Sequence, residues 1–219
     1  WGVVLGALLH AMIQLPSLFA DGFFHRMPRM RHPRDLFTTA SISLPRALAL
    51  SMNQLTFVGL VAFAGLLTTG SIAVFMFAFN LAAVPLAVIG ASYSVAAFPT
   101  LARALSKGET DTFVGYVATA ARYVLFWSIP ASALILVLRA HIVRVILGTG
   151  AFNWDDTRLT AAAFALIGFA LAAQGLTLLL VRGYYAAGKT FVPLVVSMVV
   201  ALSTLLMAAG GLFGLTDQT

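Results

Sequence analysis

Long stretches without a charged residue are the feature that most constrains this chain. Residues 47–102 contain no Asp, Glu, Lys or Arg, and residues 1–20, 159–181 and 190–216 contain none either. A helix needs roughly 20 apolar residues to cross a hydrocarbon layer about 30 Å thick. The first stretch is therefore long enough for two crossings, and each of the others for one. A chain with this pattern folds in a membrane.

Composition leads to the same class and excludes several others. The chain is 61% hydrophobic and 9% charged, with a mean hydropathy of +0.98, whereas soluble domains are about one quarter charged. A soluble enzyme is thereby excluded. The net charge of +6 does not indicate nucleic-acid binding, because the cations lie in short connectors between apolar stretches.

The chain also lacks the residues on which common catalytic and metal sites depend. It has no cysteine, which excludes disulfides and thiol catalysis, and it has no phosphate-binding loop or hydrolase motif. His10 and His141 have no partner at a metal-ligand spacing. We therefore expect no enzyme activity, no cofactor and no metal site.

The apolar stretches predict an all-α, polytopic transmembrane helix bundle of about six spans. One stretch, residues 123–138 between Arg122 and Arg139, is too short to cross alone, so one of these two arginines must lie at or inside the membrane boundary. Thr68 to Ser71 supply the turn between the second and third spans. The predicted helices cover about 1–20, 38–67, 71–105, 112–146, 157–182 and 190–213.

The connectors between six spans alternate between two sides of the membrane, and the cations divide unequally between them. Connectors 21–35, 103–111 and 182–189 carry eight positive residues, while the other side carries three, offset by aspartates. The positive-inside rule assigns the first side to the cytoplasm. The longest basic connector, His25 to Arg34, is expected to anchor the topology and to meet anionic lipid headgroups.

Several polar and helix-bending residues lie inside the predicted spans, where contact with lipid does not require them. Bent helices that carry amides and arginines are typical of a water-filled transport cavity. The amides could instead form hydrogen bonds between helices, and Arg122 could reach the headgroups rather than face a cavity. The predicted substrate-binding residues are Arg46, Asn53, Gln54, Asn80, Arg122 and Gln174, and the predicted hinges are Pro85, Gly90 and Pro130.

All acidic residues lie in connectors or in the C-terminal tail. Proton- or sodium-coupled antiporters normally need a carboxylate inside the membrane. The pattern therefore favours a carrier of an anionic or neutral substrate.

The order and spacing of several motifs resemble the MurJ/MviN family of lipid II flippases, within the multidrug/oligosaccharidyl-lipid/polysaccharide exporter superfamily. The resemblance covers nearly the whole chain. Its motifs are Leu8-Leu-His-Ala-Met-Ile-Gln14-Leu-Pro16, Gly70-Ser71, Phe98-Pro99-Thr-Leu101, Ile146-Leu-Gly148-x-Gly150-x-Phe152 and Gly183-Tyr-Tyr185-Ala186.

The resemblance implies most of the second lobe of a fourteen-helix, two-lobe transporter, here helices six to eleven. Residues 1–20 would be the last helix of the first lobe, 21–37 the basic cytoplasmic connector, 38–213 five second-lobe helices and 214–219 an outward-facing tail. The other lobe would belong to a longer chain, in keeping with a sequence that opens at Trp1 within an apolar run.

The implied function is translocation of undecaprenyl-pyrophosphate-linked peptidoglycan precursor across the bacterial cytoplasmic membrane by alternating access. Its implied partners are that lipid-linked precursor and membrane lipids. The chain departs from the family pattern at two places. Where the family commonly has an acidic residue followed by an arginine, this chain has Phe79-Asn80. Where the family commonly has a second acidic residue, this chain has Ala83. The alternatives are a drug or cation exporter of the same superfamily and a noncatalytic membrane scaffold whose transport residues have decayed.

Overall fold

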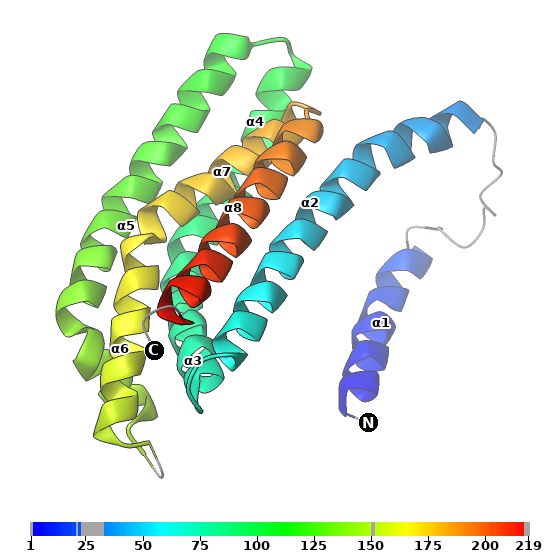
Figure 1. Ribbon diagram of the computed structural model, residues 1–219. Coiled ribbons are helices and arrows are strands. Elements are labelled where there is room, and N and C mark those ends of the chain that lie inside the picture. Colours follow the sequence, from blue (N-terminus) through cyan, green and yellow to red (C-terminus); the bar gives the residue numbers. More distant parts are fainter. Residues whose placement is uncertain (1, 21, 23–32, 150–151, 217–219) are drawn as a thin grey trace. The chain divides into compact units, whose positions relative to one another are not determined.

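The computed structural model describes residues 2–20, 22, 33–149 and 152–216, and these residues form helices joined by short turns, with no strand among them (Figure 1). The chain divides into two compact units, Trp1–Ser41 and Ile42–Thr219. The predicted all-α, polytopic helical class is confirmed.

The first unit contains helix α1 and the first turns of helix α2. Helix α1 covers Gly2–Ala20, as predicted for residues 1–20, and its His10 and Gln14 side chains are 2.8 Å apart, one helical turn from each other. Helix α2 covers Pro33–Gly65 and begins inside the predicted connector 21–37. Proline is favoured in the first turn of a helix because no partner for its missing N–H is needed there. Residues 23–32 of the connector lie outside the described residues.

The second unit contains the rest of α2 and the helices that follow it. The predicted boundaries for 71–105, 112–146 and 190–213 are confirmed to within a few residues. The helices are α3 (Ser71–Pro85), the π-helix η2 (Leu86–Ala91), α4 (Ser92–Ser106), α5 (Thr110–Leu147), α6 (Trp154–Phe169), α7 (Leu171–Ala186) and α8 (Phe191–Thr216).

The number of membrane-spanning helices is smaller than the predicted six among the described residues. Four helical segments are long and apolar enough to cross a membrane, and the bent pair α6–α7 would make a fifth. In α1 the apolar segment Gly2–Ser17 is shorter than a typical crossing of roughly 20 residues. The predicted span over residues 1–20 is therefore a helix whose apolar segment, among the described residues, is shorter than a full crossing.

The predicted single helix over 157–182 is wrong, because the chain bends by 45° between α6 and α7. The last turn of α6 tightens, with the Ala170 N–H donating to the Ile167 carbonyl at 3.1 Å. Gly168 lies directly against Ile135 of α5, where any side chain on Gly168 would collide. Glycine is a weak helix former, so the helix bends easily near Gly168. The close contact with Ile135 lies at the same place.

Two helix ends in the second unit close with the same glycine motif. Gly108 and Gly188 have positive φ values of 75° and 69° after α4 and α7. The N–H of the following residue returns to the helix, with Glu109 donating to Ala104 and Lys189 to Tyr184, both at 3.0 Å. This Schellman arrangement satisfies carbonyls at the helix end and turns the chain back.

The turns of the second unit alternate between its two ends, as predicted. The α4–α5 and α7–α8 turns lie together at one end, whereas the α2–α3 turn and the α5–α6 connector lie at the other (Figure 1). At the second end Asn153 begins α6 with a reciprocal capping box, in which its side chain accepts from the Asp156 N–H at 2.9 Å.

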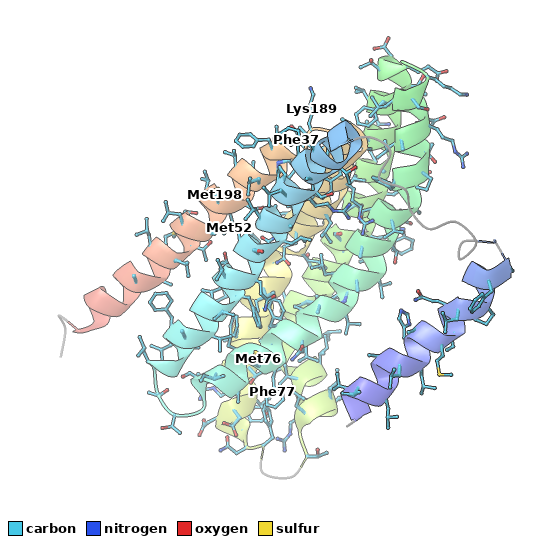
Figure 2. The ribbon with its side chains drawn as sticks, turned by 90° about the vertical axis from the view of Figure 1, so that its right-hand side faces the viewer. Phe37, Met52, Met76, Phe77, Lys189 and Met198 are labelled. Carbon is cyan, nitrogen blue, oxygen red and sulfur yellow. The ribbon has the colours of Figure 1, made fainter. Side chains whose placement is uncertain are left out.

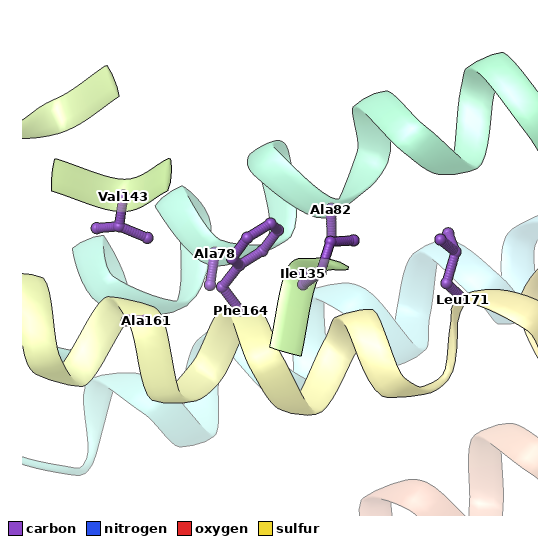
Figure 3. Close-up of a cluster of buried hydrophobic side chains, with 7 residues drawn as sticks. All are labelled: Ala78, Ala82, Ile135, Val143, Ala161, Phe164 and Leu171. Atoms are coloured by element: carbon purple, nitrogen blue, oxygen red, sulfur yellow. The ribbon is translucent and has the colours of Figure 1, made fainter. Parts of the chain in front are cut away.

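Small side chains let α3 approach α6 closely in the core. Phe164 of α6 points between Ala78 and Ala82 of α3, and all three are buried (Figure 3). The cluster is completed by Ile135, Val143, Ala161 and Leu171. Helices α3 to α7 thus form the packed centre of the second unit.

The alternation of turns leads to a prediction about sidedness. Because this chain has no cysteine, a single cysteine introduced at Lys107, Lys189 or Thr69 is the only thiol within it. We expect an impermeant maleimide added to intact cells to label Thr69→Cys only, since the positive-inside rule places the other two positions in the cytoplasm. Labelling of Lys107→Cys or Lys189→Cys before permeabilisation would contradict this assignment.

Candidate functional site

Arg46 is held by an aromatic ring from a helix far away in the sequence. Its guanidinium carbon lies 5.0 Å from the centre of the Tyr185 ring, which comes from the last turn of α7. Such a cation–π contact contributes about 0.5–1 kcal/mol where it is exposed. Arg46 itself is exposed, so its charge remains available to an anion.

A cluster of three phenylalanines attaches α2 to α3 beyond this contact. The Phe57 ring of α2 lies 4.9 Å from the Phe79 ring and 6.0 Å from the Phe75 ring of α3. Phe57 is eleven residues after Arg46, close to three helical turns, so the two share a face of α2.

The three predicted amides on α2 and α3 are exposed. Asn53 shares the face of α2 that carries Arg46 and Phe57, yet its side chain is not covered by the bundle, and Gln54 and Asn80 are also exposed (Figure 2, where Met52 and Met76 mark the two helices). Among the described residues no hydrogen bond involves these three amide side chains, so the alternative of bonds between these helices is not observed. An amide without a partner in hydrocarbon costs several kcal/mol.

Gln174 and Arg182 of α7 are half-buried, and Gln174 lies in the first turn after the bend. Gln174 and Tyr185 are eleven residues apart and therefore share a face of α7. The structure thus places Gln174 on the side of α7 that also holds Arg46, and Asn53 lies on the same side of α2 as Arg46. We call Arg46, Asn53 and Gln174 the polar face, and Gln54 and Asn80 are exposed outside it.

Arg122 is not brought to this face. It lies on α5 and is exposed, and it is two residues before the fully buried Val124, which places it on nearly the opposite side of the helix. Among the described residues it makes no hydrogen bond or ion pair. Of the two interpretations left open by the sequence, this position favours contact with headgroups.

The predicted hinges lie in two different settings. Pro85 ends α3, and the π-helix η2 follows at once, with Gly90 buried inside it. The missing N–H of a proline and the wider turn of a π-helix both interrupt regular α-helical bonding. Pro130 is exposed, and α5 continues through it without a break. The hinge roles of all three stay predictions.

A close crossing of three helices was not apparent from the sequence. A Cβ on Gly90 would lie 3.0 Å from the Gly175 Cα, and a Cβ on Gly175 would lie 2.9 Å from Val124 Cγ1. The buried Ser128 hydroxyl borders this crossing and has no hydrogen-bond partner. The sequence shows that Gly90 and Gly175 are small, but in a chain with 18 glycines this does not predict which of them meet at a helix crossing.

Comparison with known proteins assigns the family. The family model described as lipid II flippase MurJ matches residues 1–217. The chain belongs to the MurJ family. With its apolar helices, this membership makes it a multi-pass protein of the bacterial cytoplasmic membrane.

Several MurJ relatives are similar over most of this chain, and each is named a probable lipid II flippase MurJ. The relative from Bdellovibrio bacteriovorus is 27% identical over 98% of this chain and 42% of its own length. The relative from Rhizobium tropici is 30% identical over 89% of this chain and 36% of its own. The relative from Vibrio cholerae is 24% identical over 95% and 40%. The chain therefore spans about 40% of the length of these MurJ relatives, and no solved structure matches it.

Proposed function

We propose that this chain forms most of the second lobe of a flippase that translocates lipid II, the undecaprenyl-pyrophosphate-linked peptidoglycan precursor, across the cytoplasmic membrane. The chain carries no chemistry of its own in this proposal and acts as a transporter rather than an enzyme. Family membership and the names of the relatives support the substrate class.

The observation that carries the proposal is a set of exposed polar side chains on otherwise apolar helices. Asn53, Gln54 and Asn80 have no hydrogen-bond partner among the described residues, so contact with lipid tails would be costly. A water-filled cavity or the remaining part of the protein would cover them at much lower cost. In a flippase these side chains would line the cavity, where amides replace water around the sugars of the substrate.

In this proposal Arg46 holds the diphosphate of the substrate. A guanidinium forms strong, charge-assisted hydrogen bonds with phosphate oxygens, and these strengthen as water is removed. Tyr185 holds Arg46 without neutralising it, since a ring face carries no net charge. Pro85 and η2 would supply the flexible point that alternating access requires, next to Asn80 on the same helix.

The proposal can be tested in cells whose own lipid II flippase is depleted. A full-length gene that contains this chain should restore growth and should restore lipid II in the outer leaflet, measured by its cleavage in spheroplasts by an enzyme added outside. A protein that inserts stably but restores neither would contradict the proposal and would fit the scaffold alternative. Export of cationic drugs without exposure of lipid II would instead support the exporter alternative.

A further inference from the structure

A narrow groove lies between α5 and α7, on the opposite side of α7 from the polar face. Gly183 lines the groove, and it is two residues from Tyr185, which places the two on opposing faces of α7. The groove has a volume of about 270 Å³. It is lined by Phe113, Val117, Leu180, Gly183, Tyr184, Ala187 and Lys189.

The missing side chain of Gly183 keeps the groove open. The nearest atom to a Cβ built there is Cζ of Phe113, 3.9 Å away, so a small side chain would fit and a larger one would fill the space. The walls are otherwise hydrocarbon and aromatic rings. Ligand pockets commonly begin near 300 Å³, so this groove suits a segment of one hydrocarbon chain rather than a sugar headgroup.

Lys189 is fixed at the mouth of the groove by the turn that follows α7. Its N–H donates to the Tyr184 carbonyl at 3.0 Å, and the Gly188 N–H donates to the Tyr185 carbonyl at 3.1 Å. The Lys189 side chain is exposed at the end of the second unit that holds the α4–α5 turn (Figure 2).

The charge of Lys189 is not neutralised within the described part of the chain. The ion pair found there joins Arg158 to Asp155, on α6. Glu109 and Asp111 begin α5 at the same end as Lys189, and neither lies within ion-pairing distance of it. An apolar groove with a free ammonium group at its mouth is complementary to a lipid that has an anionic headgroup.

We propose that this groove is a binding site for an anionic phospholipid of the bilayer, with one acyl chain between α5 and α7 and the phosphate at the Lys189 ammonium. The occupant is a bilayer lipid and not the transported precursor, because the groove and the polar face lie on opposite sides of α7. The site thus goes beyond the proposed transport function.

The site can be tested with the purified, delipidated membrane protein in detergent. Dioleoyl-phosphatidylglycerol and dioleoyl-phosphatidylcholine have the same acyl chains and differ in net charge. We expect phosphatidylglycerol to raise the unfolding midpoint by several degrees more than phosphatidylcholine, because a ligand that binds only the folded state stabilises it. Lys189→Gln should weaken phosphatidylglycerol binding about fivefold, the usual effect of one basic residue.

Two matched controls come from the chain itself. Lys107 is an exposed cation in the other Schellman turn at the same end but does not line the groove, so Lys107→Gln should leave phosphatidylglycerol binding unchanged. Gly183→Leu should abolish the stabilisation by phosphatidylglycerol. Gly115→Leu should not, since nothing lies within 4 Å of a Cβ at Gly115.

The proposal fails if the two lipids stabilise the native protein equally, or if Lys107→Gln weakens phosphatidylglycerol binding as much as Lys189→Gln does. It also fails if undecaprenyl pyrophosphate displaces bound phosphatidylglycerol, which would assign the groove to the substrate. If the Gly183→Leu protein does not fold, phosphatidylglycerol binding by Lys189→Gln alone decides whether the proposal holds. Exposure of lipid II by the Lys189→Gln variant should stay normal, so the lipid site and the proposed transport can fail separately.

Discussion

Replacing Gly90 by leucine is expected to destabilise the protein by about 3 kcal/mol, near the upper end of the usual cost of overpacking. A Cβ at Gly90 would lie 3.0 Å from the backbone Cα of Gly175, which cannot rotate away as a side chain can. Helix propensity alone favours leucine over glycine by roughly 0.8 kcal/mol. A fall in stability would therefore report the close crossing of η2 and α7. The thermal midpoint and the fraction of monodisperse protein in detergent measure it.

Gly115→Leu is the matched control for Gly90→Leu. Gly115 lies in α5 with nothing within 4 Å of a Cβ, so the same substitution should leave the thermal midpoint unchanged or raise it. Gly175→Ala should give a smaller loss than Gly90→Leu, since its nearest contact is the end of the Val124 side chain. If Gly90→Leu were as stable as Gly115→Leu, the helix crossing would not constrain the fold.

Replacing Arg46 by glutamine is expected to lower the rate of lipid II exposure in the outer leaflet at least about tenfold, while the amount of protein in the membrane stays normal. Hydrogen bonds to a charged group contribute about 1.5–3 kcal/mol, which corresponds to roughly tenfold or more in binding or rate. The loss of an exposed cation–π contact with Tyr185 costs only about 0.5–1 kcal/mol, too little to unfold the protein.

Arg122→Gln and Arg139→Gln serve as controls for Arg46→Gln. Arg122 lies on the side of α5 away from Val124, and Arg139 lines a separate pocket with Asp155 and Arg158 near the other end of α5. We expect both variants to expose lipid II at near-normal rates. A large loss in Arg122→Gln, with Arg46→Gln unaffected, would move the anion-holding role to α5 and overturn the role given to Arg46.

Most of the helix boundaries followed from the sequence because hydrocarbon allows few alternatives. A backbone without water must satisfy its hydrogen bonds within each segment, so the uncharged stretches become helices and the short glycine-containing connectors between them become turns. The ends of α5 and α8 were predictable to within a few residues for this reason. The bend at Ala170 was not predictable, because no proline marks it in the sequence. It coincides instead with a tertiary contact, between Gly168 and Ile135.

In the candidate site, too, some features were predictable from the sequence and others depended on the tertiary structure. The sequence by itself determined which side chains are unusual in apolar helices, namely the amides, Arg46 and Arg122. Only the tertiary structure decided which of them share a surface, because the rotation of each helix about its axis depends on the residues it packs against. It placed Tyr185 beneath Arg46, although the two are far apart in the chain, and it turned Arg122 away from the buried side of α5. Contacts of this kind, like the packing of Gly90 against Gly175, join residues far apart in the chain, and no local sequence pattern encodes them.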